Sequence, residues 1–193
     1  MTKSEKTREF IIQQSASIIN KKGIAGTAIS DLMEATGLAK GGIYGNFESK
    51  EEICSEVFDY LTRKVGVGLE AAIATKTTAR EKLFALLDYY ADGVGPSEMG
   101  GCPLLNFGIE ADDTNPALKQ RVAKAIKRSQ QRMAKLIEEG QASGEFNKKI
   151  DAGLFALKMF TMIEGAIFSS RVTNNRTIMK TITDILKNEI DSF

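Results

Sequence analysis

The chain has 193 residues, of which 42% are hydrophobic and 26% charged, and its formal net charge is +1. These proportions are typical of a folded globular protein and exclude a disordered chain, while the near-neutral charge gives no sign of bulk attraction to nucleic acid. Histidine is absent, so histidine-dependent hydrolases and zinc enzymes are disfavoured, and we expect no catalytic residue, no cofactor and no metal.

The N-terminal segment predicts a first helix over residues 6–21. Apolar residues recur there at three- and four-residue spacing, and Gly23 follows as a terminator. The charged residues at the start of the chain contain no apolar core of a signal peptide. Two cysteines, Cys54 and Cys102, lie far apart without metal-knuckle or redox spacing, and we expect a cytoplasmic protein in which both stay reduced.

Two short helices are predicted next, over residues 28–36 and 40–47. Thr27 is placed to cap the first of them, and Gly37 suits its C-terminal turn because glycine tolerates a positive φ. The second has barely two turns and cannot be stable alone. It must therefore be held by the packing of its apolar neighbours, Leu38, Ile43 and Phe47. The spacing is that of a helix-turn-helix, and an ordinary helical hairpin is the alternative.

The rest of the chain also has helical periodicity, which predicts an all-α protein. Capping-box pairs open two further helices, at Ser49 and at Thr78. The most apolar stretch, residues 154–168, is interrupted by Lys158 and Glu164. These charges argue against a membrane span, and we expect no membrane partner.

The run TAISDLMEATGLAKGGIYGNFESK, residues 27–50, resembles the DNA-binding signature of the TetR/AcrR family of transcriptional regulators. In that family a Thr or Ser opens the second helix, a Gly-hydrophobic pair makes the turn, and a Tyr-x-x-Phe run with a following Ser-Lys ends the recognition helix. The run GCPLLNF at residues 101–107 is similar, more loosely, to the family's ligand-binding regions. The resemblance implies an N-terminal three-helix helix-turn-helix DNA-binding domain (1–50), a connecting helix (50–74) and a C-terminal helical ligand-binding and dimerisation domain (75–193).

Carried over by position, the resemblance implies which side chains meet DNA. Thr27 and Tyr44 would touch phosphates with their hydroxyls, and Lys50 would reach a phosphate from the start of the fourth helix. Lys40 would donate to guanine O6 or N7, and Asn46 would pair with adenine or contact a phosphate. The structural alternatives are packing of the Tyr44 ring on the first helix and plain surface positions for Lys50 and Asn46.

Glycines and three departures from the family pattern limit what can be predicted about this DNA-binding site. Gly41 and Gly42 would let the backbone approach the duplex closely, at a cost in helix stability. Ala39 stands where a capping Ser or Thr is usual, Met33 where a small Ala is usual, and Gly45 where an aromatic residue or His is frequent. A missing cap costs about 1 kcal/mol. The motif therefore predicts phosphate-positioning residues rather than a readable operator sequence.

The C-terminal half predicts a dimer surface and a ligand pocket. Apolar residues cover nearly all faces of the helix at residues 154–168, more than the core of a monomer needs, and the last helix, 177–190, adds a second stripe. The resemblance implies that these two helices form a four-helix interface with a second copy. Methionine and phenylalanine at helical spacing are more often plain core than pocket. The expected pocket lining is Phe84, Leu87, Tyr90, Cys102, Leu105, Phe107, Met159, Phe160 and Met162.

Two charged sets admit other interpretations. Glu110, Asp112 and Asp113 could be catalytic carboxylates, but we interpret them as a solvated turn before a helix start. The basic residues of one long helix could be a nucleic-acid surface, but we interpret most of them as a solvated face. They are Lys119, Arg121, Lys124, Lys127, Arg128, Arg132 and Lys135.

The sequence thus predicts a homodimer that binds double-stranded operator DNA and an unidentified small-molecule effector. It would repress transcription until the effector shifts it off DNA. Two alternatives stay open. One is a ligand-carrying or enzymatic helical protein with a purely structural N-terminal hairpin. The other is a nucleoid-like DNA binder that has neither a sensor nor a sequence preference.

Overall fold

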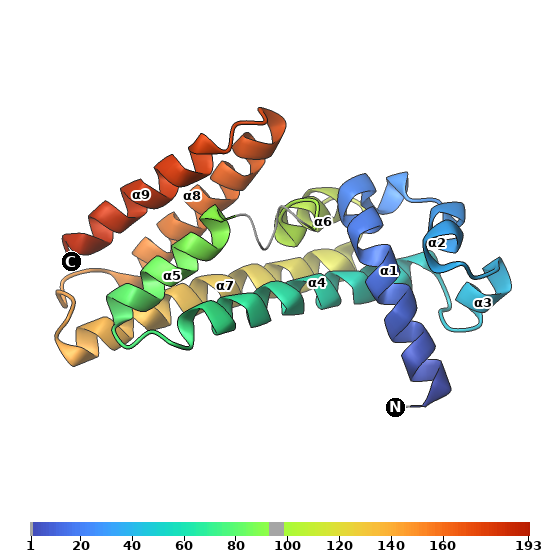
Figure 1. Cartoon of the computed structure of the whole chain (residues 1–193), viewed down its shortest axis with the longest axis horizontal. Coiled ribbons are helices and arrows are strands. Elements are labelled where there is room, and N and C mark those ends of the chain that lie inside the picture. The colour runs from blue at the N-terminus through green and yellow to red at the C-terminus, as the bar shows by residue number, and fades with distance from the viewer. Residues whose placement is uncertain (1, 93–98) are drawn as a thin grey trace. The chain divides into compact units, whose positions relative to one another are not determined.

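The protein is described by a computed structural model that covers residues 2–92 and 99–193 (Figure 1). Within these residues the chain forms nine α-helices and no strand, which confirms the all-α fold class. The helices are α1 (Lys3–Gly26), α2 (Ile29–Thr36), α3 (Lys40–Tyr44), α4 (Lys50–Ile73), α5 (Ala79–Ala91), α6 (Pro103–Ala111), α7 (Pro116–Ser143), α8 (Ala152–Val172) and α9 (Thr177–Asp191).

The described residues divide into two compact units, and the divisions fall inside α4 and α7. The first unit holds residues 2–64 and 99–122, and the second holds 65–92 and 123–193. The predicted boundaries at residues 50 and 75 do not coincide with these divisions. The reason is that α6 packs on α1 and also contributes the Phe107 ring, which lies 5.4 Å from the Phe58 ring of α4. The assignment of a function to each segment stays a prediction.

Helix α1 begins at Lys3, three residues earlier than predicted, because Thr2 and Glu5 form a capping box. Its helical geometry breaks at Gly23, whose φ of 78° is open to glycine, and a short turn continues to Gly26. One face of the helix is buried in the first unit, through Ile11, Ile12, Ala16 and Ile19. Gly23 is therefore the terminator that the sequence predicted.

Helices α2 and α3 lie where they were predicted, with two differences. Ala28 rather than Thr27 is the N-cap of α2, and the Asp31 carboxylate accepts a hydrogen bond from the Ala28 amide at 2.9 Å. Helix α3 has five residues and ends at Tyr44, three residues earlier than predicted; its N-cap, Ala39, makes no side-chain hydrogen bond, and its glycines lower its helix propensity. Of the three residues predicted to hold α3 by packing, Ile43 and Phe47 are buried in the first unit and Leu38 is half-buried.

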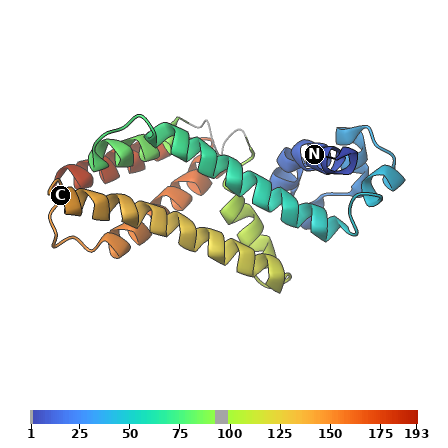
Figure 2. The ribbon, with the colours of Figure 1, turned by 90° about the horizontal axis from the view of Figure 1, so that it is seen from below.

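In the second unit, α9 lies against both α5 and α8 (Figures 1 and 2). The side chains of Phe155 and Met159 on α8 are buried, and the Phe193 ring lies 4.6 Å from that of Phe155. Among the described residues, α8 is the helix that is long and apolar enough to cross a membrane by length and composition alone. Such helices are also found in the cores of soluble proteins.

Candidate nucleic-acid interface

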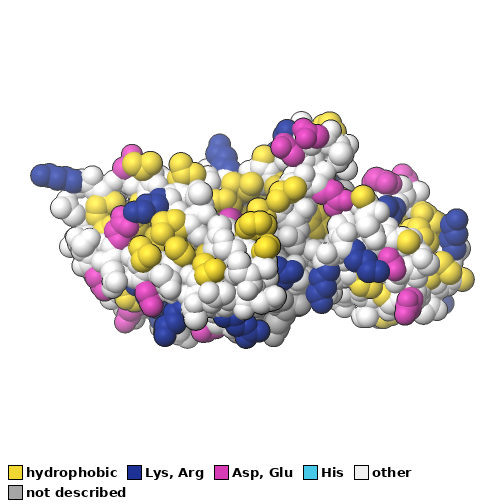
Figure 3. Space-filling model, turned by 90° about the horizontal axis from the view of Figure 1, so that it is seen from above, with side chains coloured by type: hydrophobic (Ala, Val, Ile, Leu, Met, Phe, Trp, Pro, Cys, Tyr) yellow, Lys and Arg dark blue, Asp and Glu magenta, His cyan; other side chains and the backbone are white. Residues whose placement is uncertain are grey.

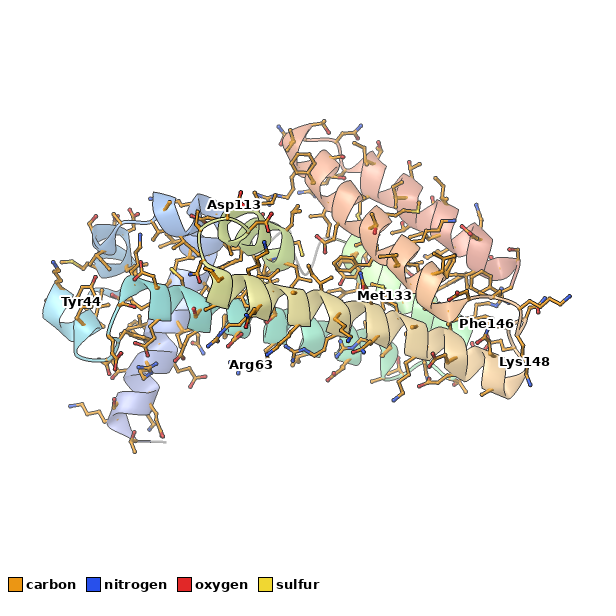
Figure 4. All side chains as sticks on the ribbon, turned by 180° about the vertical axis from the view of Figure 1, so that it is seen from behind. Tyr44, Arg63, Asp113, Met133, Phe146 and Lys148 are labelled. Atoms are coloured by element: carbon orange, nitrogen blue, oxygen red, sulfur yellow. The ribbon has the colours of Figure 1, made fainter. Side chains whose placement is uncertain are left out.

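Helix α3 has one face buried in the first unit and one face exposed to solvent. Ile43 is fully buried, while Lys40, Gly41 and Tyr44 are exposed, with the Tyr44 side chain 37% accessible. Figure 4 shows Tyr44 on the outer part of this helix. The Lys40 ammonium lies 5.9 Å from the Tyr44 ring, one helical turn away. The structure thus brings a cation, a phenolic hydroxyl and a bare stretch of backbone to one exposed surface.

The glycines of α3 are not required by the packing of the chain. A Cβ placed on Gly41 would meet nothing within 4 Å, and one on Gly42 would make ordinary contact with Leu38. Glycine inside a helix costs about 1 kcal/mol relative to alanine. Gly45 differs, because a Cβ there would approach the Gly41 carbonyl oxygen at 3.0 Å. At Gly41, no neighbouring group of the chain requires the absence of a side chain.

The Asn46 side chain is held by neighbours on both of its polar ends. Its Nδ2 donates to the Gly42 carbonyl oxygen at 2.9 Å, and its Oδ1 accepts from the Ser4 hydroxyl of α1 at 3.3 Å. One N–H of the amide remains for another partner. Asn46 therefore sits in a defined orientation at the end of α3, next to the first turn of α1.

Thr27 and Lys50 make their polar contacts inside the first unit. Thr27 is 1% exposed, and its hydroxyl donates to the Gly23 carbonyl oxygen at 2.6 Å. The hydroxyl that was predicted to donate to a phosphate therefore donates to the backbone of α1 in this structure. The Lys50 ammonium donates to the carbonyl oxygens of Ile24 and Thr27 at 2.8 and 3.1 Å. An ammonium has three N–H bonds, so one is left for a phosphate.

Arg8 on α1 contacts the end of the recognition helix, and sequence reasoning missed it. Its guanidinium donates to the Asn46 carbonyl oxygen, forms ion pairs with Glu52, at 2.7 Å, and Glu56 of α4, and lies 4.1 Å from the centre of the Phe47 ring. The hydrogen bond from Arg8 lowers the pKa of Glu52 below its ordinary value. No local pattern reveals this contact, because its partners lie 38 to 48 residues away.

Glu110 on α6 was interpreted as part of a solvated turn, and this is wrong. Its carboxylate accepts hydrogen bonds from the backbone amides of Ile24, at 2.6 Å, and Ala25. These amides directly follow the break in α1, where a new helical turn leaves its first amides without acceptors, and a carboxylate from another helix accepts from them. The helix end predicted at Gly23 indicated that the amides after it would need a hydrogen-bond acceptor. Asp112 forms an ion pair with Lys119.

The basic residues of α7 are in part neutralised by nearby carboxylates. Arg121 pairs with Asp59 of α4 at 2.6 Å, and Arg132 pairs with Glu70 at 2.7 Å. Such pairs reduce the positive field that a phosphate backbone would meet. The geometry favours the solvated-face interpretation for these two residues.

The residues predicted to line a ligand pocket fall in both compact units. Cys102, Leu105 and Phe107 belong to the first, and the other six belong to the second. Leu87 and Met159 are fully buried. Two surface hollows of about 390 and 580 Å³ lie in the second unit, and neither contains a predicted lining residue. The pocket therefore stays a prediction. Among the residues that the structure covers, no group of His, Cys, Asp and Glu side chains could hold a metal ion.

A second surface, the outer face of α8 and α9, is apolar and exposed. We call this set the α8–α9 face, and it comprises Leu154, Leu157, Phe168, Val172 and Ile185, which are 46 to 66% accessible. Figure 3 shows hydrophobic side chains gathered over these helices. Exposed large apolar side chains that lie on neighbouring helices are typical of interaction surfaces.

Comparison with known proteins identifies both parts of the chain. The family described as "Bacterial regulatory proteins, tetR family" matches residues 11–57, and "Tetracyclin repressor-like, C-terminal domain" matches residues 79–186. The HTH-type transcriptional repressor DhaR of Mycobacterium sp. (strain GP1) is 25% identical over 173 residues, which cover 88% of this chain and 84% of DhaR.

Two solved structures are similar over nearly the whole chain. One is a TetR-family transcriptional regulator from Cytophaga hutchinsonii, with a TM-score of 0.94 and 39% identity over 100% of this chain and 97% of that one. The other is a TetR transcriptional regulator from Chloroflexus aurantiacus J-10-FL, with a TM-score of 0.93 and 38% identity over 99% and 97% of the two chains. The similarity therefore includes the helix-turn-helix and the helices that follow it.

Proposed function

The chain belongs to the TetR family of bacterial regulatory proteins, and from that premise we propose that it is a dimeric repressor whose operator binding is released by a small molecule. It is a DNA-binding transcriptional regulator. The similarity to DhaR, which is named as a repressor, supports repression as the sign of its action. We place its action in the cytoplasm, where its operator would be.

The exposed face of α3 is the surface that we assign to the major groove. Lys40 would donate to guanine, Tyr44 would donate its hydroxyl to a phosphate, and Asn46 would use its remaining N–H toward a base or a phosphate. Lys50 would contribute its third N–H to a phosphate. The single observation that carries this assignment is the exposure of Lys40, Gly41 and Tyr44 on α3, where the bare backbone of Gly41 would allow a close approach to DNA.

Two copies of the chain are needed for operator-level specificity. A short recognition helix reads few bases, and a two-fold dimer doubles that number by placing two such helices about 34 Å or more apart on the duplex. The α8–α9 face is the surface that we assign to the dimer, because its exposed apolar residues would be buried by the same residues of a second copy.

Release from DNA would follow from ligand binding by the helical remainder. An effector that binds better to a conformation unsuited to the operator lowers DNA affinity by its differential affinity for the two states. An apolar effector is favoured by the predicted lining, which is rich in Phe, Met and Leu.

The test is selection of duplexes from a random pool by the purified protein, followed by anisotropy titrations with the selected duplex. We expect Lys40→Ala to reduce the preference for the selected duplex over a scrambled one. Tyr44→Phe should weaken both complexes by a similar factor, of roughly three- to tenfold, since it removes one hydrogen bond to a phosphate. Lys148→Ala is the control, because Lys148 is exposed in the second unit and outside the α3 surface (Figure 4).

Each alternative has its own outcome in this test. Failure to enrich any duplex while the protein is folded would contradict the proposed function and favour a ligand-carrying protein. Tight binding to all duplexes alike would indicate a nucleoid-like binder. Footprinting of the region upstream of its own gene, with and without cell extract, tests release by an effector.

A further inference from the structure

The contacts of Arg8 tie the recognition helix to two other helices. Arg8 projects from α1, donates to the Asn46 carbonyl oxygen at the end of α3, stacks on Phe47 and pairs with Glu52 of α4. Its side chain is only 29% exposed, and its guanidinium has five N–H donors in a fixed plane. One planar group thus satisfies a helix-end carbonyl, an aromatic face and the carboxylates of α4 at once.

Helix α3 needs such support because little within it resists movement. It has five residues, two of them glycine, and its N-cap is Ala39, which provides no side-chain cap. A helix of this length is not stable on its own. Its buried anchor is Ile43, the fourth residue of the helix, and the chain just beyond its C-terminal end, at Asn46, is contacted by Arg8 and Ser4 of α1.

We propose that Arg8 is a positioning residue for operator recognition, which acts by fixing where the Asn46 end of α3 lies and hence what the Asn46 amide can read. This rests on the proposed function. Arg8 holds the main chain of Asn46, while Ser4 and Gly42 hold its amide, so the remaining N–H points in one direction. Loss of the guanidinium plane frees the end of α3 and removes the base preference that depends on Asn46.

The test compares Arg8→Lys with the wild-type chain on duplexes that differ by one base pair of the selected site. Lysine keeps the charge but cannot contact the Asn46 carbonyl, the Phe47 ring and the Glu52 carboxylate together. We expect Arg8→Lys to lose about tenfold in preference at the base pair at which Asn46→Ala loses preference, within the usual cost of one mismatched pair. The double variant Arg8→Lys/Asn46→Ala should lose no more preference there than Asn46→Ala alone, because both act through one group.

Three further measurements separate positioning from other roles. Circular dichroism and thermal unfolding of Arg8→Lys establish that the variant is folded at the titration temperature. If Arg8→Lys is not folded, Glu56→Gln, which removes one ion pair of Arg8, takes its place. Hydrogen exchange of the Asn46 and Phe47 amides is then compared between this variant and the wild-type chain. Faster exchange together with a weaker base preference supports the proposal, and an unchanged base preference overturns it. The dependence of affinity on salt should be the same for Arg8→Lys, Arg8→Ala and wild type, because the proposal gives Arg8 contacts within the protein and none with phosphate.

Two results would overturn the proposal while leaving the proposed function intact. One is an unchanged base preference in Arg8→Lys. The other is a fall in the salt dependence of Arg8→Ala by about one charge per subunit relative to Lys148→Ala, which would make Arg8 a direct phosphate contact. The proposed function itself fails only if the wild-type chain selects no duplex.

Discussion

The two surfaces assigned to partners are built in opposite ways. The α3 surface lies on a helix of five residues that carries glycines and an uncapped start, and it is supported by buried Ile43 and by the contact of Arg8 with Asn46. The α8–α9 face lies on helices of 21 and 15 residues. Their inner residues are buried in the second unit, and their outer residues are apolar. One surface depends on its supports, and the other depends on its own side chains.

This difference has a physical reason. A groove-reading helix must present polar groups and bare backbone to DNA, so it cannot also contribute much apolar burial to the fold, and its neighbours must position it. A dimer face contributes its free energy through buried apolar area, which long amphipathic helices provide directly. Changes on the α8–α9 face should therefore act at their own site, whereas changes to the buried residues beneath α3 should act through packing.

The largest effect is expected at the α8–α9 face, from Phe168→Glu. Phe168 is 53% exposed, and a charge there in each subunit would lie in the proposed interface. Loss of two phenylalanine contacts together with the cost of burying two carboxylates should weaken the dimer by roughly 100-fold or more. Sedimentation velocity measures this, and DNA affinity should fall with it.

The matched control for Phe168→Glu is Val67→Glu, at an exposed apolar residue of α4 that is 60% accessible. It should leave the dimer intact. A dimer that survives Phe168→Glu at low concentration would show that the two surfaces do not differ as proposed.

The next effect is expected beneath α3, from Ile43→Ala. Ile43 is fully buried and anchors a helix that cannot form alone. Its truncation should lower the free energy of unfolding by about 3 kcal/mol, as for other buried aliphatic residues. Urea unfolding measures the change, and Ile109→Ala, at a residue that is 69% exposed, should change it little. Equal effects of the two variants would contradict the dependence of α3 on its supports.

A smaller effect, of opposite sign for stability and binding, is expected from Gly41→Ala. The position is open to solvent and tolerates a Cβ, so alanine should stabilise the fold by about 0.5–1 kcal/mol. The same methyl group would stand between the backbone and DNA, and we expect affinity to fall several-fold. Thermal unfolding and anisotropy measure the two quantities. An affinity that rises along with stability would argue against α3 as the groove-facing helix.

The smallest effect is a pH dependence of stability that arises from the ion pair between Arg8 and Glu52. The pKa of Glu52 is lowered from its ordinary 4.5 by its hydrogen bond from Arg8. Its contribution to stability is thus present above the unfolded pKa and is lost as the pH falls through the lower folded pKa. In urea unfolding at about pH 7 and about pH 3, Glu52→Gln should lose less stability on acidification than the wild-type chain. Glu51→Gln, at an exposed neighbour outside the partners of Arg8, should behave as the wild type.

Much of the helical framework could be predicted from local patterns. Periodicity, capping boxes and the glycines at 23 and 37 place the first helices within a few residues, because these signals depend on neighbours within one or two turns. The cap of α2 was misplaced by one residue. Thr27 has the right side chain for that role, but the break at Gly23 gives its hydroxyl a carbonyl oxygen to bind instead.

The sequence by itself determined the family, the helical class and the exposed residues of α3, because each of these is encoded in a short run of the chain. Only the tertiary structure decided which charged side chains contact the backbone of the DNA-binding unit. Arg8 and Glu110 meet backbone groups 38 and 86 residues away, and nothing local distinguishes them from solvated charges. Contacts of this kind depend on how helices pack, and the main-chain groups that they involve are present in almost every residue type.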